Sequence, residues 1–157
     1  MNFEDILTLL IGTAETKPNP SQLIEACRKF NMHQIEYYNL NGDPLFNIGY
    51  NFIFKTERGE EARLEIIQVD DELLQAGFQV IYKSMFFFQK AKRDFSYIFK
   101  SLKTYYHNEQ IQDFGVDKIF NLYNDISHCY ISRSKINGKE VITFRVSNKE
   151  TWTKYNH

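Results

Sequence analysis

The sequence predicts an α+β fold in which helices cover an antiparallel sheet, and two kinds of spacing lead to this prediction. Apolar residues alternate with polar ones over several runs, as in half-buried strands, and recur every three or four residues over others, as in helices. The length of 157 residues, of which 43% are hydrophobic, suits a single domain over residues 1–157. The expected order is ααββββα(α)ββ, a four-strand meander followed by helices and a C-terminal hairpin.

Two helices are expected at the N-terminus. Asn2 is placed to cap the first, and Gly12 lies near its expected end. After two prolines, Ser21 is expected to cap the second helix, which carries Cys27 on its apolar side. A chain of this length builds a core without disulfides, so Cys27 and Cys129 are expected to be buried, reduced thiols. The apolar stripe of the first helix consists of Phe3, Ile6, Leu7, Leu10 and Ile11.

Two strands and two turns are expected next. Residues 33–40 and 45–56 both alternate between apolar and polar side chains. The Asn-Gly-Asp-Pro sequence at 41–44 is strong turn chemistry, so the two runs are expected to form a hairpin. A second turn is expected at 57–60, around Gly59.

The meander is completed by a third and a fourth strand. In the third strand, residues 62–70, the apolar side chains move from even to odd positions, so a β-bulge is expected near Ile66. The fourth strand is expected at 78–85, after a loop at 73–77. An alternative stays open here, because residues 71–82 also fit the beginning of a helix.

The longest helix is expected after the meander. Its apolar stripe runs from Phe88 to Tyr105 in steps of three and four residues. The following segment, residues 108–127, is ambiguous, although Gly115 resembles a break and Asp117 resembles a helix cap. A short helix is the interpretation that we choose for it.

Asn137-Gly138, between two alternating runs, is the strongest short-range signal for a β-hairpin. A two-residue turn fixes the register and pairs Ile131 with Phe144, because residues at equal distances from the turn face each other. Paired residues share a face of the sheet, which sorts the two runs into an apolar and a polar side. The side expected to be buried consists of Cys129, Ile131, Ile142, Phe144 and Val146.

Arg133 is the exception on the apolar side of this hairpin. We expect it to reach outward past the edge of the core or to pair with Glu140. The alternative is functional, with the guanidinium facing a bound anion.

Acidic and basic residues are segregated along the chain, although the formal net charge is only −1. Between Glu57 and Glu72 seven acids occur with two bases, whereas between Lys83 and Lys103 six bases occur with one acid. This layout suits contact with a charged partner or with a second copy of the chain.

The acids are expected to form an acidic rim around the third strand: Glu57, Glu60, Glu61, Glu65, Asp70, Asp71 and Glu72. Four bases are expected on one flank of the long helix, as a basic patch: Lys92, Arg93, Lys100 and Lys103. The plainer interpretation of both is a solvated surface.

The sequence carries no recognisable catalytic, metal or cofactor motif. None of the four histidines has a second ligand at the spacing of a zinc site, and the seven glycines never cluster into a phosphate-binding loop. His128 and Cys129 are adjacent in an expected strand, so they point to opposite faces and do not meet as base and nucleophile. We therefore expect no catalytic residue, no metal and no cofactor, while a hydrolase assembled from distant residues stays open.

These features favour a non-enzymatic protein-binding module, above all an immunity or antitoxin-type inhibitor that neutralises a basic partner such as a toxin nuclease. Carboxylates of the acidic rim would occupy the positions of substrate phosphates. The alternative is a nucleic-acid-binding or accessory-complex subunit that uses the basic helix at 83–106. The acidic rim disfavours nucleic-acid binding, because its carboxylates repel phosphates. The N-terminus lacks the features of a secretion signal and no long apolar run exists, so a cytoplasmic location without a membrane span is expected.

Overall fold

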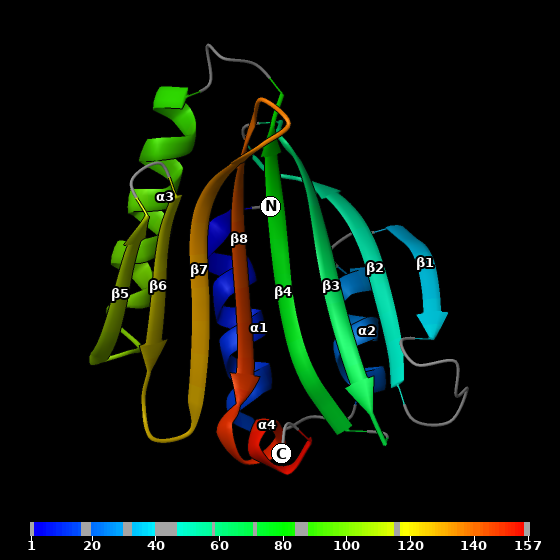
Figure 1. The fold of residues 1–157 in the computed structure, drawn as a ribbon. Helices are drawn as coiled ribbons and strands as arrows, with labels where there is room; N and C mark the ends of the chain where they lie inside the picture. Colours follow the sequence, from blue (N-terminus) through cyan, green and yellow to red (C-terminus); the bar gives the residue numbers. More distant parts are fainter. Residues whose placement is uncertain are drawn as a thin grey trace.

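The computed structural model describes residues 2–16, 20–29, 33–39, 47–57, 59–70, 72–83, 88–114 and 117–155. These residues form four helices and one eight-stranded antiparallel sheet with the strand order β1-β2-β3-β4-β8-β7-β6-β5, shown in Figure 1. The helices are α1 (Phe3–Thr16), α2 (Pro20–Lys29), α3 (Phe88–Leu102) and α4 (Lys149–Tyr155). The strands are β1 (His33–Asn39), β2 (Asn47–Lys55), β3 (Glu61–Val69), β4 (Glu72–Tyr82), β5 (Asn108–Phe114), β6 (Asp117–Tyr123), β7 (Ser127–Ile136) and β8 (Lys139–Asn148).

The predicted α+β class is confirmed, but the C-terminal hairpin has a more central place than the expected order implied. Strand β8 pairs with β4, and β7 pairs with β6, so the hairpin joins the meander to the β5–β6 pair. Figure 1 shows α1 and α2 behind the strands and α4 at one end of the sheet. The opposite face of the sheet carries no helix across its middle in the described part of the chain.

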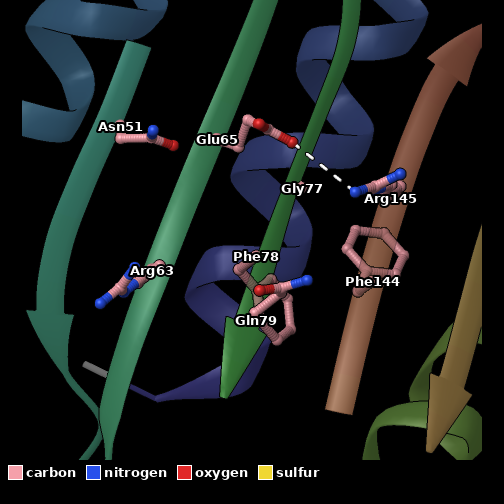
Figure 2. Close-up of a pocket in the computed structure, with 8 residues that line it drawn as sticks. All are labelled: Asn51, Arg63, Glu65, Gly77, Phe78, Gln79, Phe144 and Arg145. Carbon is pink, nitrogen blue, oxygen red and sulfur yellow. Dashed lines mark ion pairs between the residues drawn. The ribbon is translucent and has the colours of Figure 1, made fainter. Parts of the chain in front are cut away.

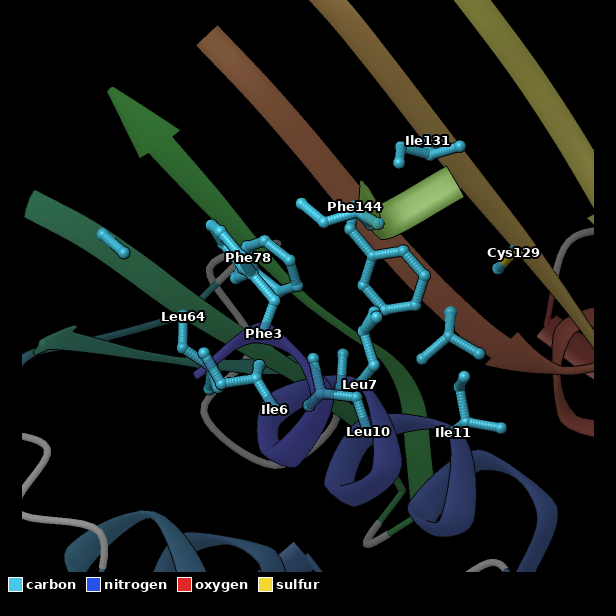
Figure 3. Close-up of a cluster of buried hydrophobic side chains, with 14 of the residues drawn as sticks. Phe3, Ile6, Leu7, Leu10, Ile11, Leu64, Phe78, Cys129, Ile131 and Phe144 are labelled. Carbon is cyan, nitrogen blue, oxygen red and sulfur yellow. The ribbon is translucent and has the colours of Figure 1, made fainter. Parts of the chain in front are cut away.

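The core lies between α1, α3 and the covered face of the sheet. Helix α1 begins where the backbone N–H of Asp5 donates to Asn2 Oδ1 (2.7 Å), which confirms the predicted cap. Its apolar stripe packs on Phe78 of β4 and Phe144 of β8, whose ring centroids are 5.4 Å apart (Figure 3). Further along β4, the Tyr82 hydroxyl donates to the buried carboxylate of Asp94 in α3 (2.8 Å).

The hairpin register predicted from Asn137-Gly138 is confirmed over its whole length. Both turn residues have positive φ, 49° and 75°, as a two-residue turn that follows the twist of the strands requires. Ile131 lies opposite Phe144, and both side chains are fully buried. The other members of the predicted face, Cys129, Ile142 and Val146, are buried as well.

The short helix predicted within 108–127 is wrong. This segment forms strands β5 and β6, which extend the sheet beyond β7. The apolar spacing of three and four residues misled the interpretation, because Ile126 belongs to the turn after β6 and is half exposed. Pairing with the already aligned strand β7 overrides this local pattern, since strand preference depends on the neighbours that a segment finds.

Strand β4 begins at Glu72, so the predicted loop at 73–77 and the alternative helix are both wrong. The strand pairs along its length with β3, where a bulge absorbs the change of face. That bulge lies between Ile67 and Gln68, one residue beyond the predicted position at Ile66. The predicted hairpin of β1 and β2 is confirmed by their antiparallel pairing, and its turn at 41–44 lies outside the described residues.

Two helix boundaries differ from the sequence prediction, and one helix was not predicted at all. Helix α1 continues past Gly12 to Thr16, and α2 already includes Pro20, so Ser21 lies inside the helix. Helix α4 was not predicted, because its start depends on a tertiary contact. Asn148 Oδ1 accepts from the backbone N–H of Glu150 (2.9 Å), while Asn148 Nδ2 donates to the carbonyl of Ala14 at the end of α1 (3.0 Å).

Candidate binding surfaces

The helix-free face of the sheet carries a row of polar side chains from neighbouring strands. Antiparallel register places Asn51 of β2, Glu65 of β3, Gly77 of β4 and Arg145 of β8 side by side. Figure 2 shows the Glu65 and Arg145 side chains reaching toward each other across Gly77, with 3.8 Å between Oε2 and Nη2. Paired strands hold these groups at fixed spacing, so the face is preorganised for contact.

Gly77 makes a hollow in the middle of this face. A Cβ atom at this position would lie 2.2 Å from the carbonyl oxygen of Phe144 and 2.9 Å from Cγ of Arg145. The close approach of β8 therefore requires glycine, and the space above the missing side chain forms a hollow of about 210 Å³. Arg63 and Gln79 stand beside it. The hollow is large enough for one side chain of a partner, and its lining includes acidic (Glu65) and basic (Arg63, Arg145) side chains.

Three residues of the acidic rim lie at one end of β3. Glu57 is exposed in the turn, and Glu61 pairs with Lys83 at 3.1 Å. Glu60 is different, because its side chain is only 8% exposed and its carboxylate forms an ion pair with Lys90 of α3. Burial raises the pKa of Glu60, but hydrogen bonds from Lys90 and from the Thr56 hydroxyl (2.8 Å) more than offset it, so the pKa lies below its usual value. Glu60 thus fastens the turn to α3.

The remaining acids lie elsewhere, so the acidic rim is not one continuous patch. Glu65 is in the middle of β3, while Asp70 and Glu72 lie at the far end of that strand. Nine residues of strand separate the two ends by about 26 Å. Glu72 pairs with Lys154 of α4 at 2.8 Å. Asp71 lies outside the described residues.

The basic patch lies on α3 and the turn after it. Lys92, Arg93 and Lys100 are exposed, and helical geometry places them along one flank of the helix. Lys103 follows the helix and forms an ion pair with Glu109 of β5 at 2.7 Å. The four bases therefore lie along α3 and the turn after it. Two of them already have an acidic partner, because Arg93 also lies 4.0 Å from Asp94.

A groove between α3 and the strands β6 and β7 adjoins this patch. It has a volume of about 330 Å³, and its lining includes Lys92 of the basic patch and Arg133 of β7. The sequence prediction singled out both residues. It missed Lys118 and Phe120, which also line the groove, because their segment was interpreted as a helix. Lys118, Phe120 and Leu122 occupy every second position, as residues on one face of a strand do, and this spacing was the available signal for a strand.

The two thiols are buried in the core, as predicted, and form no disulfide. Burial raises the pKa of both Cys27 and Cys129 to about 12, so neither is a thiolate nucleophile at neutral pH.

Over the described ranges, no three histidine, cysteine, aspartate or glutamate side chains come together as a metal site. None of the described helices is long and apolar enough to cross a membrane.

No protein-family model, curated protein or solved structure matches this chain. A functional assignment therefore depends on the geometry and charge of the surfaces described above.

Proposed function

We propose that this chain is a non-enzymatic protein-binding module that uses the helix-free face of its sheet. The observation that carries the proposal is the row of strand-borne polar and charged side chains around the Gly77 hollow. Buried apolar groups cover the other face, so this face is where a partner meets a rigid surface of mixed charge. Such a surface gives specificity through complementary charges at fixed positions.

In its more specific form, the proposal is an inhibitor of the immunity or antitoxin type, which covers the site of a basic partner such as a toxin nuclease. Glu61 and Glu65 lie on the helix-free face, while Glu57 and Asp70 are exposed at the two ends of β3. Glu61 and Glu65 already pair with Lys83 and Arg145. A basic partner therefore gains affinity chiefly by exchanging these ion pairs, and the exposed acids contribute mainly to its rate of approach.

The test begins with isolation of the partner from the native host with the tagged chain, followed by stopped-flow association at low and high salt. Gln79→Trp fills the hollow with a large side chain. A triple variant with Glu57→Lys, Glu61→Lys and Asp70→Lys reverses two exposed acids and the partly exposed Glu61, and leaves the buried Glu60 in place. A variant with Arg93→Glu and Lys100→Glu reverses charges on α3 and serves as the control.

We expect the hollow variant to dissociate at least tenfold faster and the acid variant to associate more slowly, with a flatter dependence on salt. The control on α3 should change neither rate by more than twofold. If only the α3 variant loses the partner, the helix-free face is not the binding surface. Concentration-dependent sedimentation of the chain alone would identify a second copy as the partner instead.

The second candidate function is a nucleic-acid-binding or accessory-complex subunit that uses α3. The observation in its favour is the groove beside the basic patch, where cationic side chains adjoin phenylalanine rings. Binding to single-stranded oligonucleotides that weakens steeply with salt, and disappears when Lys92, Arg93, Lys100 and Lys103 are changed to Gln, would establish it.

A further inference from the structure

We propose that the groove between α3 and the strands β6 and β7 binds a small ligand that combines an aromatic ring with an anionic group. This inference is independent of the proposed function, because the groove lies on the helix side of the sheet and the Gly77 hollow on the other. The groove unites two kinds of side chain that recognise the two halves of such a ligand. Its lining includes Phe95, Phe99, Phe120, Lys92, Lys118 and Arg133.

The apolar half of the site consists of the three phenylalanine rings. Phe99 and Phe120 approach each other most closely, with ring centroids 4.4 Å apart, and Phe95 lies 5.8 Å from Phe120. Phe95 is buried, whereas Phe99 and Phe120 are only partly covered. Rings at these spacings prefer offset or edge-to-face contacts, so a planar ring entering the groove finds further aromatic partners.

The charged half of the site consists of three cations from three different elements. Lys92 is on α3, Lys118 on β6 and Arg133 on β7, and backbone register sets Lys118 and Arg133 side by side. No acidic side chain lines the groove among the described residues. Glu140 lies behind it and pairs with Arg133 at 3.8 Å, and Asp113 is opposite Lys118 in the β5–β6 register. Three cations in the lining, with Glu140 paired to Arg133, favour an anionic group in the ligand.

Arg133 links the two halves. Its side chain is 11% exposed, and its guanidinium carbon lies 6.0 Å from the centroid of the Phe95 ring. A guanidinium held against an aromatic face and an acid keeps a fixed orientation, so an anion that enters the groove meets its positive charge without a large loss of side-chain entropy. The predicted pairing with Glu140 and the alternative of an anion-facing arginine are therefore compatible.

The size of the groove limits the ligand. About 330 Å³ is near the lower end for small-molecule sites, which combine a mostly apolar lining with a few convergent polar groups. A bicyclic aromatic carboxylate or phosphate suits this volume. The matching probes are 1-naphthoate and 1-naphthyl phosphate, with uncharged 1-naphthamide and ringless acetate as comparisons.

The experiment is a titration of the full chain with each probe, in which isothermal titration calorimetry measures the binding. We expect saturable binding of 1-naphthoate or 1-naphthyl phosphate with a Kd of about 1 mM or tighter. The tighter of the two identifies the anionic group. Naphthamide should bind at least tenfold more weakly, and acetate should give no saturable signal, because each lacks one half of the ligand.

Matched variants locate the binding. Lys92→Gln with Lys118→Gln removes two charges from the groove and should weaken 1-naphthoate at least tenfold. Arg93→Gln with Lys100→Gln removes two charges from the same side of the molecule but outside the groove, and should change the Kd by less than twofold. Arg133 is left intact, because its loss would leave Glu140 buried without its cation. Circular dichroism checks that both variants fold.

Three results would overturn the proposal. They are no saturable binding of either anionic probe up to 5 mM, equal binding of naphthamide and naphthoate, and equal weakening by the two double variants. Displacement of 1-naphthoate by a ten-nucleotide single strand at a concentration a hundredfold below that of a mononucleotide would assign the groove to nucleic acid and would also reject a small ligand.

Discussion

Gly77 illustrates at the scale of one residue how the fold and the candidate binding face depend on each other. The glycine lets β8 approach β4 in the centre of the sheet, and the same missing side chain leaves the hollow between Glu65 and Arg145. We expect Gly77→Ala to destabilise the chain by about 1–3 kcal/mol, because the new methyl group meets backbone atoms that cannot move away. Urea unfolding measures the change.

Gly12 provides the matched control for this substitution. It lies inside helix α1, and a Cβ atom there meets nothing within 4 Å apart from its chain neighbours and the backbone of its own helix. Gly12→Ala should therefore stabilise the chain by about 0.5–1 kcal/mol, because alanine loses less backbone entropy in a helix. If both substitutions change the free energy of unfolding in the same direction, this result would contradict the close approach of β8 to Gly77.

Phe144 gives a second prediction at this scale. Its ring is fully buried against Phe78, so Phe144→Ala should lower the free energy of unfolding by about 3–5 kcal/mol. Tyr97→Ala removes a ring of similar size that is 47% exposed, and should cost about 1 kcal/mol or less. Chemical denaturation of both variants distinguishes the two environments, and equal losses would contradict the burial of Phe144.

At the scale of the element, the two ends of the sheet differ in how far the sequence determines them. The β7–β8 hairpin was predicted residue by residue, because Asn137-Gly138 fixes the turn locally and the turn fixes the register. Strands β5 and β6 have no turn signal of this strength, and the spacing of Lys118, Phe120 and Leu122 at every second residue is the weaker indication in β6. They are strands because β7 offers an edge on which Phe120 and Leu122 find partners, and that edge exists only in the folded sheet.

The candidate sites likewise differ in how far the sequence predicts them. Arg133 and Lys92 were identified from the sequence, because each is a charged residue beside an apolar stripe. The groove itself was not predictable, since Phe120 and Lys118 enter it only after β6 has joined the sheet. The acidic rim was predicted as one feature because its members are close in sequence, but an extended strand moves neighbours in sequence far apart in space.

The turn between β2 and β3 carries a prediction about pH. Glu60 has a folded pKa below its unfolded value, so its ionised form stabilises the fold. This contribution is fully present above the unfolded pKa of about 4.5 and is lost as the pH falls through the folded value. We expect Glu60→Gln to lose about 1.5–3 kcal/mol at pH 7, because Lys90 then lacks its charged acceptor.

Urea unfolding between pH 7 and pH 3 tests this prediction. The difference between wild type and Glu60→Gln should shrink as the pH falls below 4.5, since wild type then also carries an uncharged side chain. Glu57→Gln, in the same turn but exposed, should match wild type at every pH. A difference that stays constant over the whole range would mean that the ion pair with Lys90 does not contribute.

At the scale of the whole molecule, the central position of the C-terminal hairpin makes the sheet one unit. Strand β4 pairs with β8, so the sheet is completed by a segment about 65 residues further along the chain. The N-terminal meander has no core of its own, because the α1 stripe that covers Phe78 also covers Phe144 and Ile131. Neither half of the sheet is expected to remain folded without the other.

This dependence predicts a single cooperative unfolding transition, and the chain provides a local probe for it. Trp152 is the only tryptophan and lies on α4 with its ring 5.4 Å from that of His128, at the end of the β7–β8 hairpin. Far-UV circular dichroism reports instead on all helices and strands. The two signals should give the same midpoint in urea, and Phe144→Ala should move both midpoints equally. If the hairpin were merely appended to an independent meander, tryptophan fluorescence would change at a lower urea concentration than the dichroism, and the substitution would separate the two midpoints further.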